Sequence, residues 1–347
     1  MFVQEVTKWY QINRRTLPWR NTNDAYIIWL SEIILQQTRV EQGLPYFYKF
    51  QERFKTVKEF ALASEDEVLK LWQGLGYYSR ARNMHATAKA VMEKHHGVFP
   101  TRYEQLLQLK GIGEYTAAAI SSFSANEPHA VVDGNVYRLL SRFFGISTPI
   151  DSTQGRKQFK ELAYELLKEA QPAEYNQAIM EFGAIQCKPA SPNCAECPLS
   201  VNCVAFIEGI VNTLPIKTKK TKVKERFFNY LVFRNNNDLL LNKRIAKDIW
   251  QNMYDFPLIE SANRLSEKEL LISDDFKQLI STKSVIIKAV SEELKHVLSH
   301  QVIYAKFWEL ECNHQENSTM QNGFWVAEEE LESYAFPKLV DNYLKKF

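Results

Sequence analysis

Four cysteines lie close together near the middle of the chain and limit what the surrounding segment can fold into. Cys187, Cys194, Cys197 and Cys203 occur within seventeen residues, with the spacing C-x6-C-x2-C-x5-C. Their neighbours are mostly polar residues and prolines, which are typical of a loop and not of an apolar face that buries free cysteines. Four thiolates at such intervals can surround one compact centre without ligands from distant sequence. The pattern predicts a metal site and not a disulfide framework.

Two kinds of centre use four cysteines. Zinc ribbons usually pair two short C-x2-C knuckles, whereas here one such knuckle, Cys194 and Cys197, is flanked by single cysteines at unequal distances. We therefore favour a [4Fe-4S] cluster held by all four cysteines, with zinc as the alternative. The fifth cysteine, Cys312, stands alone and is predicted to be a small buried residue.

Length and composition indicate two globular domains. The chain has 347 residues, of which 45% are hydrophobic and 13% aromatic, and one domain typically takes about 150 residues. The formal net charge of +2 excludes a uniformly basic coat, so a polyanion would bind a local patch. No apolar run approaches the roughly 18 residues of a membrane span, and Glu5 and Lys8 stand where a signal peptide would be apolar. We expect a cytoplasmic monomer without membrane association.

The two domains differ in their periodicity. Residues 1–212 show apolar residues at helical spacing, with Gly and Pro separating about ten helices, so this part is predicted to be all-α. Residues 213–226 carry six basic residues against one acid and are predicted to be a linker. Residues 227–347 contain a hairpin signal around Asn235 to Asp238, further β-rich runs and a helical tail over residues 338–346 that should pack on the sheet. This second domain is predicted to be α+β.

A pair of glycines occurs between two predicted helices. Gly111 and Gly113 lie two residues apart in LKGIGEYT, ahead of a helix-forming alanine run. Such a turn can free backbone N–H groups at a helix N-terminus and bind a phosphate. A plain interhelical turn is the alternative, and this motif alone leaves both open.

Glu32 is a candidate general acid. It lies in the helical stretch IWLSEIIL, where its neighbours one turn away are apolar: Ile28, Trp29 and Leu35. Burial disfavours the charged carboxylate and raises its pKa, which suits a group that must deliver a proton. The alternative is a structural carboxylate paired with Arg20 or Arg39.

Asp133 is a candidate for the opposite role. It precedes an amphipathic helix in VVDGNV, so it is expected to be an N-cap. The positive end of a helix keeps a carboxylate ionised, which suits a group that stabilises a cation. Two carboxyl groups in opposed environments allow one site to hold both an acid and an anion.

Together these motifs resemble a known family. A glycine hairpin followed about twenty residues later by VDGNVYR, and then by the four cysteines, is similar to the helix-hairpin-helix DNA glycosylases with an iron–sulfur cluster. Within that group LPWR (17–20), WLSEIILQQTRV (29–40), LWQGLGYYSRARNMH (71–85) and the added second domain resemble the MutY-type adenine DNA glycosylases. The resemblance covers about three-fifths of the chain. It implies a base-excision repair enzyme that removes adenine opposite 8-oxoguanine or guanine from duplex DNA and leaves an abasic site.

The resemblance also implies roles for residues. Glu32 would protonate the adenine ring and Asp133 would stabilise the sugar cation, supported by Tyr115 and Asn135. This is chemically reasonable, because adenine leaves poorly until its ring is protonated and the sugar then gains oxocarbenium character. The implied DNA contacts lie in duplex-wedging stretches, the hairpin and a lesion-reading loop: Gln37, Thr38, Tyr77, Gly111, Gly113, Ser299 and His300.

The chain departs from the family pattern in places. Lys110 stands where the hairpin usually has proline, and Leu298 stands where the lesion-reading loop commonly has an aromatic residue. The second domain looks Nudix-like through Trp250 and DFPLIE, but no REx2E cluster follows to hold a divalent metal. We therefore expect this domain to recognise a base and not to hydrolyse a nucleotide.

Two alternative functions are open to the same fold. Bifunctional enzymes of the endonuclease III kind place a lysine at the position of Tyr115 to form a Schiff base, which tyrosine cannot do. A non-catalytic iron–sulfur DNA-binding protein would have no need for Glu32 and Asp133 together. We therefore expect a monofunctional glycosylase.

Overall fold

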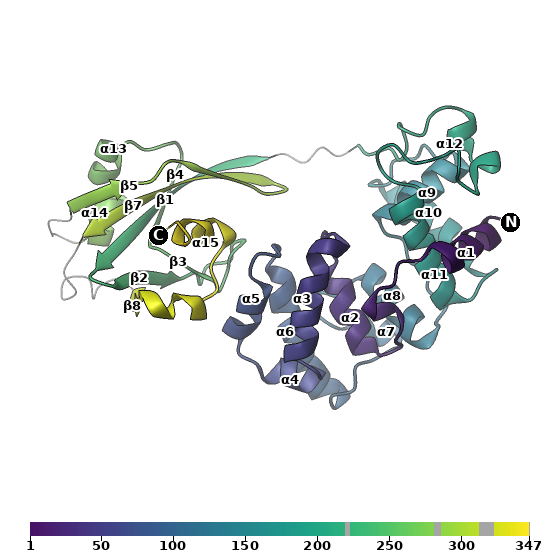
Figure 1. Cartoon of the computed structure of the whole chain (residues 1–347), viewed down its shortest axis with the longest axis horizontal. Helices are drawn as coiled ribbons and strands as arrows, with labels where there is room; N and C mark the ends of the chain where they lie inside the picture. Colours follow the sequence, from purple (N-terminus) through teal and green to yellow (C-terminus); the bar gives the residue numbers. More distant parts are fainter. Residues whose placement is uncertain (219–222, 281–285, 312–322, 347) are drawn as a thin grey trace. The chain divides into compact units, whose positions relative to one another are not determined.

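The computed structural model describes residues 1–218, 223–280, 286–311 and 323–346. The chain divides into two compact units (Figure 1). The helical unit comprises Met1–Leu62 and Asn83–Lys220, and the sheet unit comprises Ala63–Arg82 and Thr221–Phe347. Cys312 lies outside the described residues, as do positions 219–222 of the predicted linker. No helix in the described ranges is both long and apolar enough to cross a membrane.

The helical unit confirms the predicted all-α domain. Its helices are α1 (Phe2–Asn13), α2 (Ala25–Ile34), α3 (Val40–Arg53), α4 (Val57–Leu62), α7 (Tyr103–Leu106), α8 (Glu114–Ala125), α9 (Gly134–Phe144), α10 (Thr153–Leu167), α11 (Pro172–Glu181) and α12 (Val204–Ile207), with α6 (Ser79–His95) beginning in the other unit. Helix α2 packs on α3 and α8, and α11 packs on α1 and α8. These contacts place the ends of α2, α8, α9 and α11 around one cavity.

Local sequence explains where α9 begins and ends. The Asp133 side chain caps its first turn, and Gly145 ends it in the left-handed conformation at φ 67°. Its apolar stripe is buried in a core shared with α1 and α11 through Val136, Leu139, Leu140 and Phe143. Burial of one stripe fixes the rotation of the helix about its axis. The N-terminus of α9, and with it Asp133, is therefore held at a defined position.

The sheet unit is a mixed sheet with helices. Its strands are β1 (Lys224–Asn235), β2 (Asp238–Lys243), β3 (Tyr254–Asp255), β4 (Leu258–Ser261), β5 (Ile286–Val290), β6 (Leu294–Val297), β7 (Gln301–Glu311) and β8 (Gly323–Ala327), and its helices are α5 (Glu65–Trp72), α13 (Glu267–Ile272), α14 (Asp274–Ile280) and α15 (Lys338–Leu344). The central order is β3-β2-β1-β7-β5, with β1 and β7 parallel. The predicted hairpin is confirmed, because Asn235 pairs with Asp238. The helical tail packs on the sheet, where Tyr343 stacks on Phe307 with ring centroids 3.9 Å apart.

The predicted linker of residues 213–226 is structured at both ends. Leu214 is buried, and Ile216 accepts a backbone hydrogen bond from Ile150 in the helical unit. At the other end, β1 begins at Lys224 and pairs with β7 from that residue on. A basic sequence does not prevent strand pairing, because the ladder uses backbone groups and the lysine side chains can point to solvent.

One helical segment belongs to the sheet unit although it lies early in the chain. The Asp66 carboxylate accepts hydrogen bonds from Lys243 Nζ at 2.9 Å and from the Tyr254 hydroxyl at 3.1 Å. Lys70 Nζ donates to the Tyr334 carbonyl at 2.9 Å. Residues 63–82 are thus anchored to strands more than 150 positions later in the chain. They lie within the 1–212 range that periodicity assigned to the first domain.

Candidate active site

A cavity of about 740 Å³ lies in the helical unit. Side chains from the end of α1 to the turn after α2, and from the facing ends of α8, α9 and α11, line it. Its lining includes six of the residues expected from the sequence to act in catalysis or DNA contact: Glu32, Tyr115, Asp133, Asn135, Gln37 and Thr38. These six residues come from three segments that are far apart in the sequence.

Glu32 is held in a protonatable state inside this cavity. It is only 8% exposed, and the Tyr115 hydroxyl donates to its Oε2 at 2.9 Å. Burial raises the pKa of Glu32 to about 7; the Tyr115 hydrogen bond opposes this rise and the charge of Asp133 adds to it. The alternative ion pair with Arg20 is not formed, because that guanidinium pairs with Glu181 instead. Glu32 therefore has the environment expected of a general acid.

Asp133 is surrounded by donors. Its Oδ1 accepts from the backbone N–H groups of Asn135 and Val136, both at 2.8 Å, and its Oδ2 accepts from Asn135 Nδ2 at 2.7 Å. The expected N-cap is thus present. Burial nevertheless raises the pKa of Asp133, against the lowering effect of these hydrogen bonds. The helix N-terminus favours the ionised form of Asp133, whereas burial favours the neutral form.

The hydrogen-bond network continues from Asp133 to the cysteine loop. Arg138 donates to Asn135 Oδ1 at 2.9 Å, to the Gly183 carbonyl at 2.6 Å and to the Cys187 carbonyl at 2.8 Å. Gly183 lies so close to Asn135 that a Cβ added to Gly183 would be 2.7 Å from the Asn135 carbonyl oxygen. Sequence analysis gave Arg138 no role, although it is the last residue of VDGNVYR. Its partners come from a distant segment that no local pattern identifies.

Glu181 is a second residue of this region that the sequence patterns did not indicate. It is 1% exposed and pairs with Arg15 and Arg20, each through an N–O distance of 2.6 Å. Burial alone would raise its pKa, but the hydrogen bonds from the two arginines lower it to about 2. This permanent anion holds the turn after α1 against the C-terminus of α11, and it forms one wall of the cavity. No periodicity could have paired residues more than 160 positions apart.

The four cysteines surround one small space. All four line a cavity of about 30 Å³ whose other walls are largely apolar. Arg142 donates to Cys187 Sγ at 3.5 Å and to the carbonyls of Lys188 and Pro189. Among the described residues no group of three or more His, Cys, Asp or Glu side chains is arranged to hold a metal ion. The donor set, four sulfurs around an apolar space with an arginine N–H directed at one of them, nevertheless fits a thiolate-bound cluster.

The expected wedge residues have unusual backbone conformations. Gln37 and Tyr77 are exposed, and both have positive φ values, 56° and 49°. Non-glycine residues seldom adopt this region, and such strain often accompanies functional sites. Gln37 lies with the carboxylates on the large cavity, as does Thr38. Tyr77 belongs to the sheet unit.

The two hairpin glycines differ in their backbone conformation and surroundings. Gly111 has φ 79°, and a Cβ there would lie 2.8 Å from Asn83 Cβ. Gly113 precedes α8, and an added Cβ would contact nothing within 4 Å. Gly111 thus forms the turn, while Gly113 leaves open space at a helix N-terminus where a phosphate can approach. Neither glycine lines the large cavity.

Ser299 and His300 lie in the turn between β6 and β7 of the sheet unit. The Tyr77 hydroxyl donates to Ser299 Oγ at 2.9 Å, and Ser299 Oγ lies 3.1 Å from His300 Nδ1. The structure therefore places an expected wedge residue and the expected lesion-reading loop side by side. They are 222 positions apart in the sequence.

Comparison with known proteins agrees with this fold and this cavity. Residues 30–165 match the family model described as HhH-GPD superfamily base excision DNA repair protein, and residues 229–346 match the NUDIX domain. The adenine DNA glycosylase of Buchnera aphidicola subsp. Acyrthosiphon pisum is 35% identical over 278 residues, which are 79% of each chain. Its counterpart from Buchnera aphidicola subsp. Schizaphis graminum is 32% identical, with coverage of 100% of this chain and 99% of the relative.

Solved structures show the same helical fold. A thermostable thymine-DNA glycosylase is 29% identical with a TM-score of 0.55, and the match covers 60% of this chain and 95% of that one. An endonuclease III in a DNA complex, at 20% identity and a TM-score of 0.52, shares the fold over the same proportions. Fold and cavity thus define a helix-hairpin-helix DNA glycosylase that binds DNA and acts in base excision repair.

Within this class the chain belongs to the adenine DNA glycosylase family, whose members are hydrolases of N-glycosyl bonds. The family resemblance seen in the sequence motifs is thereby confirmed, together with the fold class and the enzyme class.

Proposed function

We propose that the enzyme excises adenine paired with 8-oxoguanine or guanine, by a monofunctional mechanism that leaves an abasic site. The observation that carries this proposal is the pair of carboxyl groups on one cavity. Glu32 has a pKa raised to about 7, and Asp133 accepts three hydrogen bonds. An acid and an anion in one enclosed space are what cleavage of an N-glycosyl bond needs.

The chemistry follows from these two positions. An adenine taken out of the base stack would enter the cavity, where Glu32 protonates the ring and makes it a better leaving group. The sugar then develops positive charge, which Asp133 stabilises while Asn135 holds its Oδ2. Tyr115 fixes the Glu32 carboxyl through its hydroxyl. Water completes the hydrolysis.

The lining of the cavity supports monofunctional action. A lyase step needs an amine that forms a Schiff base with the sugar. Among the residues that the structure describes, no lysine lines this cavity, and Tyr115 directs its hydroxyl at Glu32. Abasic DNA should therefore be the product.

Recognition of the opposite base is assigned to the sheet unit. Chemistry at Glu32 cannot distinguish a mispaired adenine from a correctly paired one, so discrimination must come from the other strand. Ser299, His300 and Tyr77 present clustered polar groups and an exposed ring, which suit hydrogen bonding to a base edge and filling of the stack. Gln37, Thr38 and the hairpin glycines would hold the duplex.

The substrate assignment is tested by measuring base release under single-turnover conditions. Duplexes with adenine opposite 8-oxoguanine or guanine should lose adenine, whereas adenine opposite thymine should react at least about a hundredfold more slowly. Strands should break only after alkali treatment. Cleavage without alkali, trapped by borohydride on a lysine, would place the enzyme in the bifunctional class. Equal rates on all three duplexes would remove the assigned specificity.

We also propose that Cys187, Cys194, Cys197 and Cys203 hold a [4Fe-4S] cluster with a structural role. When bound, the cluster would supply a rigid centre for the loop, and Arg142 would donate to the Cys187 sulfur. The purified protein should be brown and contain about four iron and four sulfide per chain. Colourless protein with one zinc per chain would contradict the assignment. Cys203→Ser should lower the iron content, whereas Ser200→Ala in the same loop should leave it unchanged.

A further inference from the structure

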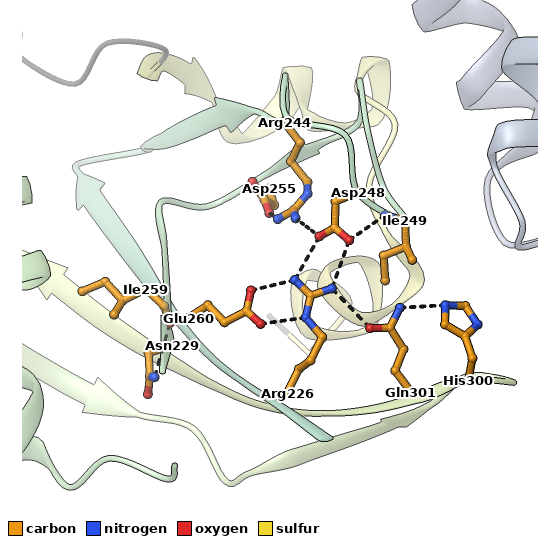
Figure 2. Close-up of polar contacts among 10 residues, drawn as sticks. All are labelled: Arg226, Asn229, Arg244, Asp248, Ile249, Asp255, Ile259, Glu260, His300 and Gln301. Atoms are coloured by element: carbon orange, nitrogen blue, oxygen red, sulfur yellow. Dashed lines mark hydrogen bonds and ion pairs between the residues drawn. The ribbon is translucent and has the colours of Figure 1, made fainter. Parts of the chain in front are cut away.

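A continuous hydrogen-bonded chain leads from Ser299 in the proposed lesion-reading loop to Arg226 in β1 of the same unit, and Figure 2 shows its part from His300 to Arg226. Ser299 Oγ lies 3.1 Å from His300 Nδ1, and His300 Nε2 lies 3.1 Å from Gln301 Nε2. Gln301 Oε1 in turn accepts from Arg226 Nη1 at 3.3 Å. Gln301 is the first residue of β7 and is only 5% exposed. The chain therefore connects an exposed loop to a buried position.

The far end of this chain is rigidly held. The Arg226 guanidinium, 11% exposed, pairs with Asp248 at 3.0 Å and with Glu260 at 2.6 Å. Arg244 links the same Asp248 to the fully buried Asp255. Figure 2 shows the two carboxylates of Asp248 and Glu260 around the Arg226 head, with Gln301 on its remaining side. Because two carboxylates hold the Arg226 guanidinium, it cannot turn, and it always presents an N–H donor to Gln301.

The chemistry of Arg226 decides which way the Gln301 amide points. A guanidinium has only donors, so the atom of Gln301 that faces it must be the carbonyl oxygen. The amide nitrogen then faces His300. Because an amide NH2 only donates, His300 Nε2 must accept, and it can accept only when it carries no proton. The neutral imidazole then carries its proton on Nδ1 and donates it to Ser299 Oγ.

We propose that Gln301, oriented by Arg226, is a positioning residue that fixes His300 in the tautomer protonated on Nδ1 and so sets the hydrogen-bonding direction of Ser299. The inference rests on the proposed function, in which Ser299 reads the base opposite adenine. With Tyr77 donating to one lone pair of Ser299 Oγ and His300 donating to the other, the Ser299 hydroxyl keeps its own proton for the base. In the other tautomer His300 would accept that proton and remove it from recognition.

This arrangement matters because 8-oxoguanine differs from guanine at two adjacent positions. It has a carbonyl acceptor at C8 and an N–H donor at N7, where guanine has only an acceptor at N7. A Ser299 hydroxyl whose two lone pairs are occupied can only donate, so it matches the C8 carbonyl acceptor that guanine lacks. Gln301 thus contributes to specificity without touching the base.

The first test reads the tautomer directly. Full-length protein labelled with 15N-histidine should show His300 Nδ1 protonated and Nε2 unprotonated, with the signal assigned by its loss in His300→Gln. Gln301→Glu keeps the shape but presents an acceptor to His300, so Nε2 should become protonated. Gln301→Met should give a mixture of tautomers. Gln278→Met, an exposed change in α14 of the same unit, should leave the spectrum as in the wild type. A wild-type His300 protonated on Nε2, or a pattern that neither Gln301 variant alters, would overturn the proposal.

The second test reads specificity in the same proteins. Single-turnover excision should show the preference for 8-oxoguanine over guanine opposite adenine reduced about threefold to tenfold in Gln301→Met, the effect of one hydrogen bond. Gln278→Met should retain the full preference. If Ser299→Ala lowers the preference and Gln301→Met does not, the positioning role is wrong while the proposed function stands. If the wild type shows no preference for 8-oxoguanine over guanine, the lesion-reading role proposed for Ser299 fails, and the tautomer measurement still decides the geometry of Gln301.

Discussion

Asp133→Asn is expected to lower single-turnover excision of adenine by at least about a thousandfold while duplex binding persists. The substitution keeps the size of the side chain and an oxygen that can accept from the N–H groups of Asn135 and Val136. It removes the negative charge that, in the proposed mechanism, stabilises the developing sugar cation. It also turns an NH2 group towards Asn135 Nδ2, which now donates to Asp133 Oδ2. The loss should therefore appear in the chemical step and not in binding.

A matched control is available at another helix. Asp24 caps α2 and accepts from the Tyr26 N–H at 2.8 Å, but it does not line the cavity. Asp24→Asn makes the same chemical change at the same kind of position. It should lower stability slightly and leave excision near the wild-type rate. Near-normal excision by Asp133→Asn would show that this carboxylate has no part in the reaction.

Glu32→Gln is expected to lower excision by about a hundredfold or more, because it removes the proton that adenine must receive. The pKa of Glu32 is raised by burial to about 7, and in the proposed mechanism the acid form is the active one. The wild-type rate should therefore be highest below pH 7 and fall as the pH rises through that value. Tyr115→Phe removes a hydrogen bond that lowers this pKa, so the decline should move to higher pH. A flat profile between pH 6 and 9 would contradict the assignment.

Although Glu32→Gln is expected to slow excision, it should raise the stability of the fold at alkaline pH. The pKa of Glu32 is raised from 4.5 in the unfolded chain to about 7 in the fold, so the folded state binds this proton more tightly. The corresponding stabilisation, about 3 kcal/mol, is complete below pH 4.5 and is lost as the pH rises through 7. Gln carries no charge at any pH. Thermal unfolding at pH 8 to 9 should thus show Glu32→Gln more stable than the wild type, with the exposed Glu104→Gln unchanged.

The features that could be predicted from the sequence are those with a local physical signal. The apolar stripe and N-cap of α9 follow from residues within a dozen positions of Asp133, and the β1–β2 hairpin follows from turn residues beside Asn235. Apolar neighbours one turn away were enough to predict that Glu32 is buried. In each case the interacting groups are close in sequence, so periodicity or turn chemistry reports on them.

The features that could not be predicted depend on distant partners. Nothing near Glu181 indicates that Arg15 and Arg20 surround it, and nothing near Arg138 indicates the carbonyl of Cys187. The direction of the Asp133 pKa shift also required the structure, because an N-cap is visible in the sequence but the depth of its burial is not. The sequence of helix α5 has the apolar periodicity of an ordinary amphipathic helix, and nothing in that periodicity indicates its contact with Lys243.

The position of α5 has a consequence for how the protein is made. Asp66 leaves the ribosome 177 residues before its partner Lys243, which at usual elongation rates of 5–20 residues per second is a delay of roughly 9 to 35 s. During that time the helical unit can fold around its own core, while residues 63–82 have no sheet to pack on. Nascent chains arrested before β2 should therefore be cut by protease within this segment, and chains released after β3 should be protected there. A later part of the chain thus completes a region that emerged well before it.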